Sequence, residues 1–325
     1  MSGPVAAPRV VDAAACERAV SEPELIDEIA RGFVAYTEQH VVVPPVGHLA
    51  LTDPPGDVHI KYGYVRGGDV FVVKVASGFP GNSNLGLPTG DGCMLVFSCH
   101  TGLLEAVLLD RSRLTDIRTA AAGAVAARAL APRTISRIGV IGTGVQARLQ
   151  PRLLRHVTTC REIALYGRSR ERAAACAADL TAAGFRVERC TSADDVVQCS
   201  DLIVTTTASR EPLFHASSVH PGSLIIAVGA DAPGKVELDP ALFARASVVV
   251  ADSIAQCADH GDLAPALAAR TISLDRVHEL GAVLADPALG RTREDEIAIA
   301  DLTGVAVQDI VIAEHVLRRL SETAA

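Results

Sequence analysis

The stretch Ser136-Arg137-Ile138-Gly139-Val140-Ile141-Gly142-Thr143-Gly144-Val145-Gln146-Ala147 decides the fold of this chain. An apolar β-branched run leads into a G-x-G-x-x-A turn, which is the order strand, tight turn, helix. Gly142 permits the turn, Gly144 has no side chain to keep a phosphate away, and Ala147 lets the helix pack closely. The pattern predicts a dinucleotide pyrophosphate at the helix N-terminus, where free N–H groups favour anions. The alternative is an ordinary β–α turn without a ligand.

A regular alternation of strands and helices follows this turn. We expect strands at 138–141, 162–166, 202–206, 224–228 and 248–251. The helices expected between them cover 146–155, 170–183, 192–198 and 240–245. This rhythm begins near Thr134, ends near Glu296, and predicts a doubly wound parallel sheet.

The part before the turn has a different pattern. Apolar residues at helical spacing predict a helix at 22–37, and a Pro- and Gly-rich loop is expected at 44–56. Strand-like runs at 58–65, 70–76, 94–98 and 105–109 predict hairpins or a meander. An alanine-rich buried helix is expected at 115–130, and a last amphipathic helix at 306–321.

Composition sets the broad class. A chain of 325 residues favours two domains, and 49% hydrophobic with 3% aromatic residues suits helix-covered parallel sheets. The net charge of −8 argues against a nucleic-acid partner. Residues 1–15 have no basic region followed by a long apolar run, and no segment approaches 18 uninterrupted apolar residues, so we expect a cytoplasmic protein without a membrane segment. The eight cysteines form no C-x-x-C pair, so we expect reduced, mostly buried thiols and no metal site.

The end of the second strand bears on the choice of cofactor. It reads Ala164-Leu165-Tyr166-Gly167-Arg168-Ser169-Arg170, without the carboxylate that would accept hydrogen bonds from a ribose 2′-hydroxyl. Arg168, Ser169 and Arg170 suit a 2′-phosphate, so NADP(H) is favoured over NAD(H). Two alternatives remain open: solvated arginines at a helix start, or Arg168 stacking on adenine in an NAD enzyme.

Four segments together make the chain resemble the ornithine cyclodeaminase/μ-crystallin family over nearly its whole length. They are Phe71-Val72-Val73-Lys74-Val75, Leu114-Thr115-Asp116-Ile117-Arg118-Thr119-Ala120-Ala121, Ile141-Gly142-Thr143-Gly144-Val145-Gln146-Ala147 and Val228-Gly229-Ala230-Asp231-Ala232-Pro233-Gly234-Lys235-Val236-Glu237-Leu238. The resemblance implies a Rossmann NAD(P)-binding domain at 131–302. It would be inserted into an α+β substrate-binding and dimerisation domain made of 1–130 plus 303–325. It also implies a homodimer and hydride transfer at the α-carbon of a small amino or imino acid.

Three residues carry the expected chemistry. A guanidinium on an apolar helix needs an anion, so Arg118 is expected to bind the substrate carboxylate, with a buried salt bridge as the alternative. The resemblance makes Lys74 catalytic and close to that carboxylate, and a desolvated lysine exchanges protons near neutrality. It also makes Asp231 the acid/base or the partner of the substrate nitrogen. The alternatives are a surface lysine and a turn-forming aspartate.

Further residues are expected around these. The cofactor contacts are Gly142, Gly144, Gln146, Ala147, Arg168, Ser169, Thr206, Thr207 and Ser209. The chain departs from the family where many members have a second carboxylate-binding arginine, since Gly47 or His48 stands there. His48 and Lys61 could restore the charge and contact substrate. A purely structural role is the alternative for His48 and for His59.

Three functions remain open. The first is an NADPH-dependent reductase of a small α-imino acid, equivalent to an amino-acid dehydrogenase in reverse. The second is an ornithine- or lysine-type cyclodeaminase with tightly bound NAD, for which the missing ribose-binding acid is unfavourable. The third is a non-catalytic protein that binds NADPH or another ligand. Retention of Lys74, Arg118 and Asp231 argues against it.

Overall fold

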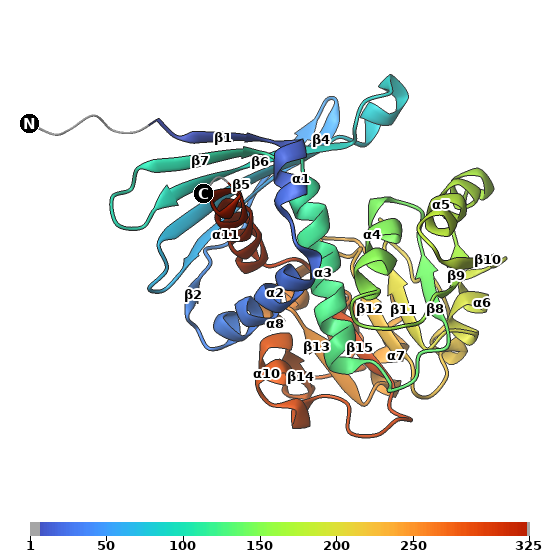
Figure 1. The fold of residues 1–325 in the computed structure, drawn as a ribbon. Helices are drawn as coiled ribbons and strands as arrows, with labels where there is room; N and C mark the ends of the chain where they lie inside the picture. The colour runs from blue at the N-terminus through green and yellow to red at the C-terminus, as the bar shows by residue number, and fades with distance from the viewer. Residues whose placement is uncertain (1–6, 324–325) are drawn as a thin grey trace, which may run out of the picture. The chain divides into compact units, whose positions relative to one another are not determined.

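An eight-stranded parallel sheet forms the middle part of the chain in the computed structural model, which describes residues 7–323 (Figure 1). Its order is β10-β9-β8-β11-β12-β15-β13-β14. The strands are β8 (Ile138–Ile141), β9 (Glu162–Tyr166), β10 (Arg186–Arg189), β11 (Leu202–Thr205), β12 (Leu224–Ala227), β13 (Val248–Ala251), β14 (Val277–Glu279) and β15 (Ala298–Asp301). Every residue of β8, β11, β12, β13 and β15 is buried, because helices cover both faces.

The connecting helices of this sheet are short. They are α4 (Val145–Leu154), α5 (Arg170–Ala182), α6 (Ala193–Gln198), α7 (Pro240–Arg245), α8 (Ile254–His260), α9 (Leu263–Ala268) and α10 (Leu280–Ala285). The strand order reverses between β8 and β11, whose residues pair in parallel. At such a switch point the connections leave in opposite directions and open a crevice at the carboxyl ends of the strands.

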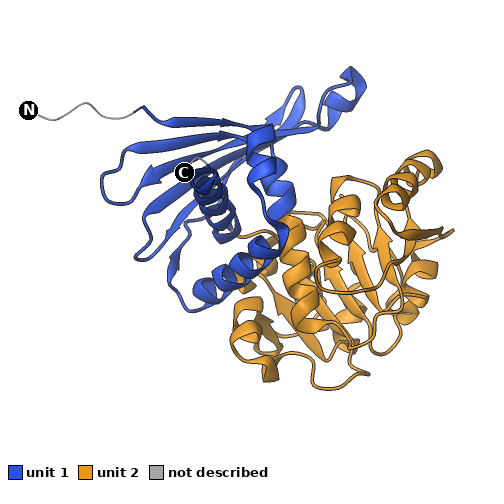
Figure 2. Ribbon diagram, viewed as in Figure 1, with its two compact units in different colours: residues 1–118, 306–325 blue, residues 119–305 orange. Residues whose placement is uncertain are grey.

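The chain divides into two units, drawn in different colours in Figure 2. Unit 2 is Thr119–Val305 and contains the parallel sheet; unit 1 is Met1–Arg118 with Ala306–Ala325. The helix α3 (Arg113–Leu130) begins in unit 1 and continues into unit 2. The two ends of the chain therefore share one unit, although the whole of unit 2 separates them in sequence.

Unit 1 is built on a second, mostly antiparallel sheet in the order β1-β7-β6-β5-β4-β2, with β3 paired to β4. Its strands are β1 (Arg9–Asp12), β2 (Val41–Val42), β3 (Gly47–Thr52), β4 (Pro55–Val65), β5 (Val70–Gly78), β6 (Gly90–Ser98) and β7 (Leu104–Leu109). Its helices are α1 (Ala13–Ala19), α2 (Glu22–Thr37) and α11 (Ala306–Glu322). Residues 7–323 also contain four 3₁₀ turns: η1 (Pro80–Leu85), η2 (Ala216–Ser218), η3 (Leu274–Arg276) and η4 (Pro287–Leu289).

The two faces of the unit 1 sheet differ. Val72, Lys74, Met94 and Val96 are buried on one face, and α11 packs against β4, β5 and α2. The alternate residues of β5 and β6 are only partly buried. Such alternation is the ordinary pattern of an antiparallel sheet with one covered face.

The predicted fold class is confirmed: a doubly wound parallel sheet and a second α+β unit. The loop expected at 44–56 was wrong, because 47–52 forms β3 and pairs with β4. Five of its six residues are exposed, so no buried alternation marks it as a strand. The sheet also continues past the expected end near Glu296, because β15 lies between β12 and β13.

The structure also tests what the sequence predicted about membrane segments and cysteines. No helix within 7–323 is long and apolar enough to cross a membrane. All eight cysteines are free thiols. Four of them are buried and two are exposed, so the expectation of mostly buried thiols holds for only half of the set.

Candidate active site

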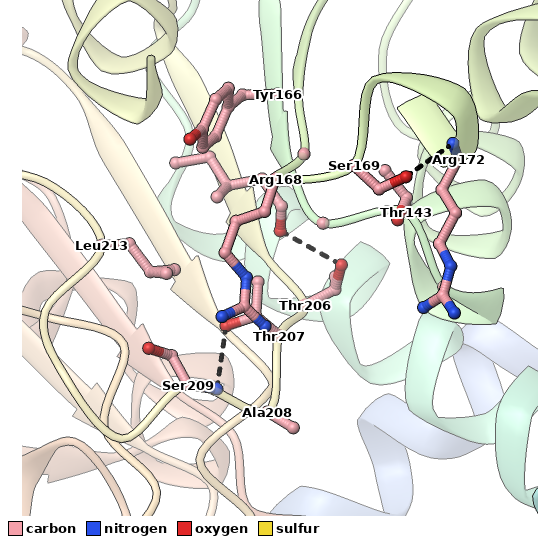
Figure 3. A pocket seen from close by; sticks show the side chains of 14 residues that line it. Thr143, Tyr166, Arg168, Ser169, Arg172, Thr206, Thr207, Ala208, Ser209 and Leu213 are labelled. Atoms are coloured by element: carbon pink, nitrogen blue, oxygen red, sulfur yellow. Dashed lines mark hydrogen bonds between the residues drawn. The ribbon is translucent and has the colours of Figure 1, made fainter. Parts of the chain in front are cut away.

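A cavity of about 550 Å³ lies at the carboxyl ends of β8, β9 and β11, at the switch point of the parallel sheet (Figure 3). The predicted cofactor residues that line it are Gly142, Gly144, Arg168, Ser169, Thr206, Thr207 and Ser209. Thr143, Tyr166, Arg172, Ala208 and Leu213 line it as well. Seven of the nine predicted cofactor residues therefore lie around one cavity, and its wall also contains residues that were not predicted as cofactor contacts.

The two glycines of the turn are present for different reasons. Gly142 has φ +130°, and a Cβ there would collide with the Thr206 side chain. Gly144 has φ −82° and ψ −166°, a conformation open to any residue, and a Cβ there would meet no protein atom within 4 Å. The protein itself therefore requires glycine at 142 only. The space beside Gly144 suits a group from outside the chain, and a pyrophosphate fits it.

The N-terminus of α4, which follows this turn, has features that favour an anion. Gly144 caps α4 without a side-chain hydrogen bond to the first turn. The backbone N–H groups of that turn and the positive end of the helix dipole therefore remain for a ligand. Arg148 donates from Nη1 to the carbonyls of Thr143 and Gly144 at 2.7 and 3.1 Å, which holds the turn in place.

Two predicted cofactor residues do not line the cavity. Ala147 is fully buried on α4, where it packs, and the Gln146 side chain accepts a hydrogen bond from Gln150. Any contact of these two residues with a cofactor stays a prediction. Ala147 is part of the buried face of α4, and the Gln146 contact lies within the helix itself.

The wall between β9 and α5 carries positive charge. Arg168, Ser169 and Arg172 line the cavity here, and in the view of Figure 3 the Arg168 side chain extends toward Thr207 and Ser209 while Arg172 lies on the right, beside Ser169. Ser169 is also the N-cap of α5 and accepts from the Arg172 N–H at 3.2 Å. Arg170, the second cation that the sequence indicated, does not line the cavity, and Arg172, the third residue of α5, lines it instead.

The wall at the end of β11 is held by one buried acid. Glu237 accepts from Thr205 Oγ1, the Thr207 N–H and hydroxyl, and the Gly229 N–H at 2.5–2.8 Å. Thr207 Oγ1 in turn accepts from the Ser209 N–H. Burial raises the pKa of Glu237 above its ordinary value, although these donors oppose the shift. Sequence reasoning missed Glu237, which fixes the loops after β11 and β12.

Two of the predicted functional residues form a second cluster inside unit 1. Lys74 on β5 and Arg118 on α3 both contact Asp309, in the first turn of α11. Lys74 Nζ lies 2.8 Å from Asp309 Oδ2, and Arg118 Nε donates to Oδ1 at 2.9 Å. Arg118 Nη1 donates to Gln308 Oε1 at 2.7 Å. The three charged side chains are 2–5% exposed.

Burial dominates the electrostatics of this cluster. It lowers the pKa of Lys74 to about 7, with Arg118 and Lys61 acting in the same direction and Asp309 against it. Burial alone would raise the pKa of Asp309, but Arg118 and Lys74 hold it below its ordinary value. Lys74 therefore changes its charge near neutrality, whereas Asp309 stays ionised.

The remaining predicted substrate residues share the face of Lys74. Lys61 on β4 lies directly opposite Lys74, and His59, two residues earlier, lies opposite His48 on β3. The two imidazole rings are 4.9 Å apart, and His59 pairs with Asp57 at 3.5 Å. Burial lowers the pKa of His59, which favours its neutral form. A contact of His48 or Lys61 with substrate stays a prediction.

Asp231 belongs to unit 2 and follows β12. Its side chain is 53% exposed and forms an ion pair with Lys235, four residues on. It is therefore a polar loop residue with a local partner. The predicted acid/base role has no direct support from these contacts and remains a prediction.

Sequence reasoning missed Asp309 and Gln308, the partners of Arg118. They lie 191 and 190 residues away from it along the chain. The only local signal was a polar pair in the otherwise apolar first turns of the last helix. The buried salt bridge that was kept as the alternative for Arg118 is present in the structure.

Known proteins similar to this chain in sequence and in fold are found over nearly its whole length. The model of the ornithine cyclodeaminase/mu-crystallin family matches residues 8–324. An uncharacterized cyclodeaminase of Sinorhizobium fredii is 42% identical over 287 residues, 88% of this chain and 87% of that protein. An archaeal alanine dehydrogenase dimer with bound NAD has a TM-score of 0.90 and 30% identity, covering 98% of this chain and 97% of its own. The iminosuccinate reductase of Paracoccus denitrificans, solved with NAD⁺, has a TM-score of 0.88 at 30% identity and covers 98% and 97%.

The crevice of the parallel sheet and the lysine-bearing second sheet define a class, the nicotinamide-dependent oxidoreductases that act on carbon–nitrogen bonds. Within it, this chain belongs to the ornithine cyclodeaminase/mu-crystallin family.

The two glycines give a matched test of the cofactor crevice. Gly144→Val should keep the wild-type melting temperature, because nothing surrounds the site and the backbone is ordinary. The valine side chain should weaken dinucleotide binding by about 10- to 100-fold, because it would displace a phosphate and remove a charge-assisted hydrogen bond. Gly142→Ala should cost about 1–3 kcal/mol of unfolding free energy, because its positive φ and close packing need glycine. Thermal melts and fluorescence titration with dinucleotide measure both. Unchanged affinity in Gly144→Val would contradict a phosphate at this turn.

Proposed function

We propose that this enzyme reduces a small α-imino acid with NADPH, or oxidises the corresponding amino acid in reverse. The observation that carries the proposal is the buried cluster in which Lys74 and Arg118 share the single carboxylate of Asp309. Lys61 adds further positive charge from the facing strand. A buried positive charge without a full partner raises the free energy of the protein. An anion that binds beside these cations is therefore strongly favoured. The carboxylate of an amino or imino acid is an anion of the required kind.

Arg118 is the proposed binding group for that carboxylate. Its Nε and Nη1 are engaged by Asp309 and Gln308, which fixes the plane of the guanidinium. The proposed contact uses Nη2, together with the ammonium of Lys74. Because arginine stays protonated, it can bind the carboxylate at every working pH.

Lys74 is the proposed proton donor to the substrate nitrogen. When the nicotinamide is bound, it supplies the hydride that adds to the α-carbon. A neutral imine nitrogen must gain one proton in that step, and Lys74, with a pKa of about 7, can release one near neutrality. The chain has three lysines among its 30 basic residues, Lys61, Lys74 and Lys235. Use of lysine at this buried position, in a chain that otherwise prefers arginine, supports a role that needs a changeable charge.

Three further roles belong to this proposal. Asp231 is the proposed partner of the substrate nitrogen, as the family resemblance implies. His48 and Lys61 are the proposed contacts of the substrate side chain, since they lie on the face of the sheet that carries Lys74. Unit 1 is accordingly the proposed substrate-binding part of the chain.

A cyclodeaminase is the second candidate, and the 42% identity to an uncharacterized cyclodeaminase favours keeping it. A direct assay separates the candidates. Pyruvate, oxaloacetate or a cyclic imino acid is mixed with ammonia where needed, and nicotinamide absorbance is followed with NADPH or NADH. Steady cofactor oxidation supports the reductase. Ammonia release from ornithine or lysine without net cofactor change supports the cyclodeaminase, and ligand binding without any turnover favours a binding protein.

The pH dependence tests Lys74. The rate constant kcat/KM for imine reduction should be level below pH 7 and fall as pH rises through about 7, because the proton donor is then lost. For oxidation of the amino acid, kcat/KM should instead rise with pH through about 7, because the lysine must then accept the proton. Lys74→Ala should lower kcat by about 10²- to 10⁴-fold, the usual worth of a positioned acid, and should leave the cofactor dissociation constant nearly unchanged. An unaltered pH limb in Lys74→Ala would show that another group titrates.

The preference for NADP(H) is also part of the proposal. Arg168 and Arg172 offer two guanidinium groups, and Ser169 a hydroxyl, at the end of β9, where the adenosine ribose binds in such folds. The described β9–α5 turn has no carboxylate to bind a 2′-hydroxyl. The two solved relatives named above hold NAD, so the preference is a property proposed for this chain alone.

Charge reversal at Arg168 tests the preference. Arg168→Glu should weaken NADPH binding by about 10- to 100-fold, with a much smaller effect on NADH, because only NADPH carries the 2′-phosphate. Arg170→Glu is the matched control, since this neighbour does not line the cavity. Dissociation constants from cofactor fluorescence decide the matter. Equal losses for the two cofactors would remove the basis for NADP(H).

A homodimer is proposed through the open face of the unit 1 sheet. The strand registers place Val10, Tyr62, Val73, Leu95 and Phe71 on this face. Val10 and Tyr62 are 64% and 40% exposed, and the Phe71 ring stacks on Phe97 at 4.8 Å. A largely apolar face of this kind favours burial against a second copy. The solved archaeal relative is a dimer.

Light scattering tests the proposed interface. Wild-type protein should have the mass of two chains, and Tyr62→Glu should shift it toward one chain, because a buried charge without a partner is unfavourable. Leu274→Glu is the control, because Leu274 is 48% exposed and lies in unit 2. A monomeric wild type, or a Tyr62→Glu variant that remains a dimer, would contradict the interface.

A further inference from the structure

Asp309 is buried between the two functional cations of unit 1. We infer that it is the positioning residue of the reaction, because its one carboxylate fixes both the proton donor and the carboxylate-binding group. The inference rests on the proposed function of that site. Neither the sequence pattern of the Lys74 strand nor that of the Arg118 helix indicates this residue.

The geometry gives Asp309 two partners at once. Oδ1 accepts from Arg118 Nε at 2.9 Å, and Oδ2 lies 2.8 Å from Lys74 Nζ. The three residues come from α3, β5 and α11, so Asp309 is the meeting point of three elements. Its side chain is 2% exposed, and water cannot replace either partner at low cost.

The neighbouring Gln308 completes the set of acceptors. Arg118 can only donate, so the Gln308 oxygen must face Nη1, as the 2.7 Å contact shows. Arg118 is thus held at two points, and its guanidinium cannot rotate about Cδ–Nε without breaking one contact. The first turn of α11 supplies both acceptors, and its helix dipole favours the ionised Asp309.

The same carboxylate controls the charge of Lys74. Desolvation, Arg118 and Lys61 all disfavour the ammonium form, and Asp309 is the main group that favours it. Asp110, which follows β7, also acts on Lys74; burial raises its pKa to about 6, so it is mostly ionised at pH 7 and supports the ammonium form beside Asp309. Removal of the Asp309 charge should therefore leave Lys74 largely neutral at pH 7 and unable to donate a proton.

Lysine NMR tests this inference without activity. Protein labelled with ¹³C,¹⁵N-lysine gives signals from three side chains, and the signal lost in Lys74→Arg identifies Lys74. Its titration should move to lower pH in Asp309→Asn, which keeps the shape and removes the charge. Lys235 should titrate as in wild type. The matched control Glu314→Gln alters a half-buried acid on the same helix and should leave Lys74 unchanged.

Kinetics test the positioning role. In Asp309→Asn, kcat for imino-acid reduction should fall by about 10- to 100-fold, and the limb of the pH profile should shift downward with the Lys74 titration. Asp309→Glu restores the charge and should return the limb toward the wild-type pH while kcat stays low. The inference would be overturned if kcat fell in Asp309→Asn while both the NMR titration of Lys74 and the limb of the pH–rate profile stayed at their wild-type pH. Failure of wild type to reduce any imino acid would instead overturn the proposed function, and the NMR result would still decide the role of Asp309.

Discussion

Two buried positive charges share one buried negative charge in unit 1, and this imbalance shapes the region around them. Isolated ions in a protein interior cost several kcal/mol each, so Lys74 and Arg118 can be buried only if Asp309 joins them. One carboxylate does not neutralise two cations completely. Burial lowers the pKa of Lys74, Arg118 and Lys61 act in the same direction, and the positive charge of these groups favours a further anion. The proposed proton exchange and the proposed carboxylate binding would therefore both depend on this excess of buried positive charge.

The contact of Asp309 with both cations also explains why the two ends of the chain belong to one unit. Lys74 and Arg118 precede unit 2 in the sequence, and Asp309 follows it. If α11 did not return to β5, the two cations would be buried without a partner. Removal of one member of a buried ion pair typically costs about 3–5 kcal/mol, a large share of the stability of a domain. The last helix is therefore an integral part of the lysine-bearing sheet.

Local patterns predicted most of the fold and part of the site. The turn at 136–147 needs only neighbouring residues to form, so its strand, glycines and helix could be read directly. Lys74 and Arg118 stood out because each is a charge in an apolar setting. Asp309 could not be paired with them, since no local rule connects residues 191 positions apart. The strand β3 was missed because its side chains are exposed, and Arg172 because helix geometry, not sequence adjacency, turns it toward the cavity.

The two basic residue types stand at positions with different proposed roles. Arginine stands at 118, the proposed carboxylate-binding position, and at 168 and 172, on the wall of the cavity at the ends of the parallel strands. A guanidinium keeps its charge and offers a planar set of donors, which suits anion binding at any pH. An ammonium has a pKa that burial can lower into the working range, and lysine stands at 74. Exchange of the two residues would preserve the charge count but reverse these properties, because an arginine at 74 could not release a proton and a lysine at 118 could not reach both Asp309 and Gln308 from one rigid plane.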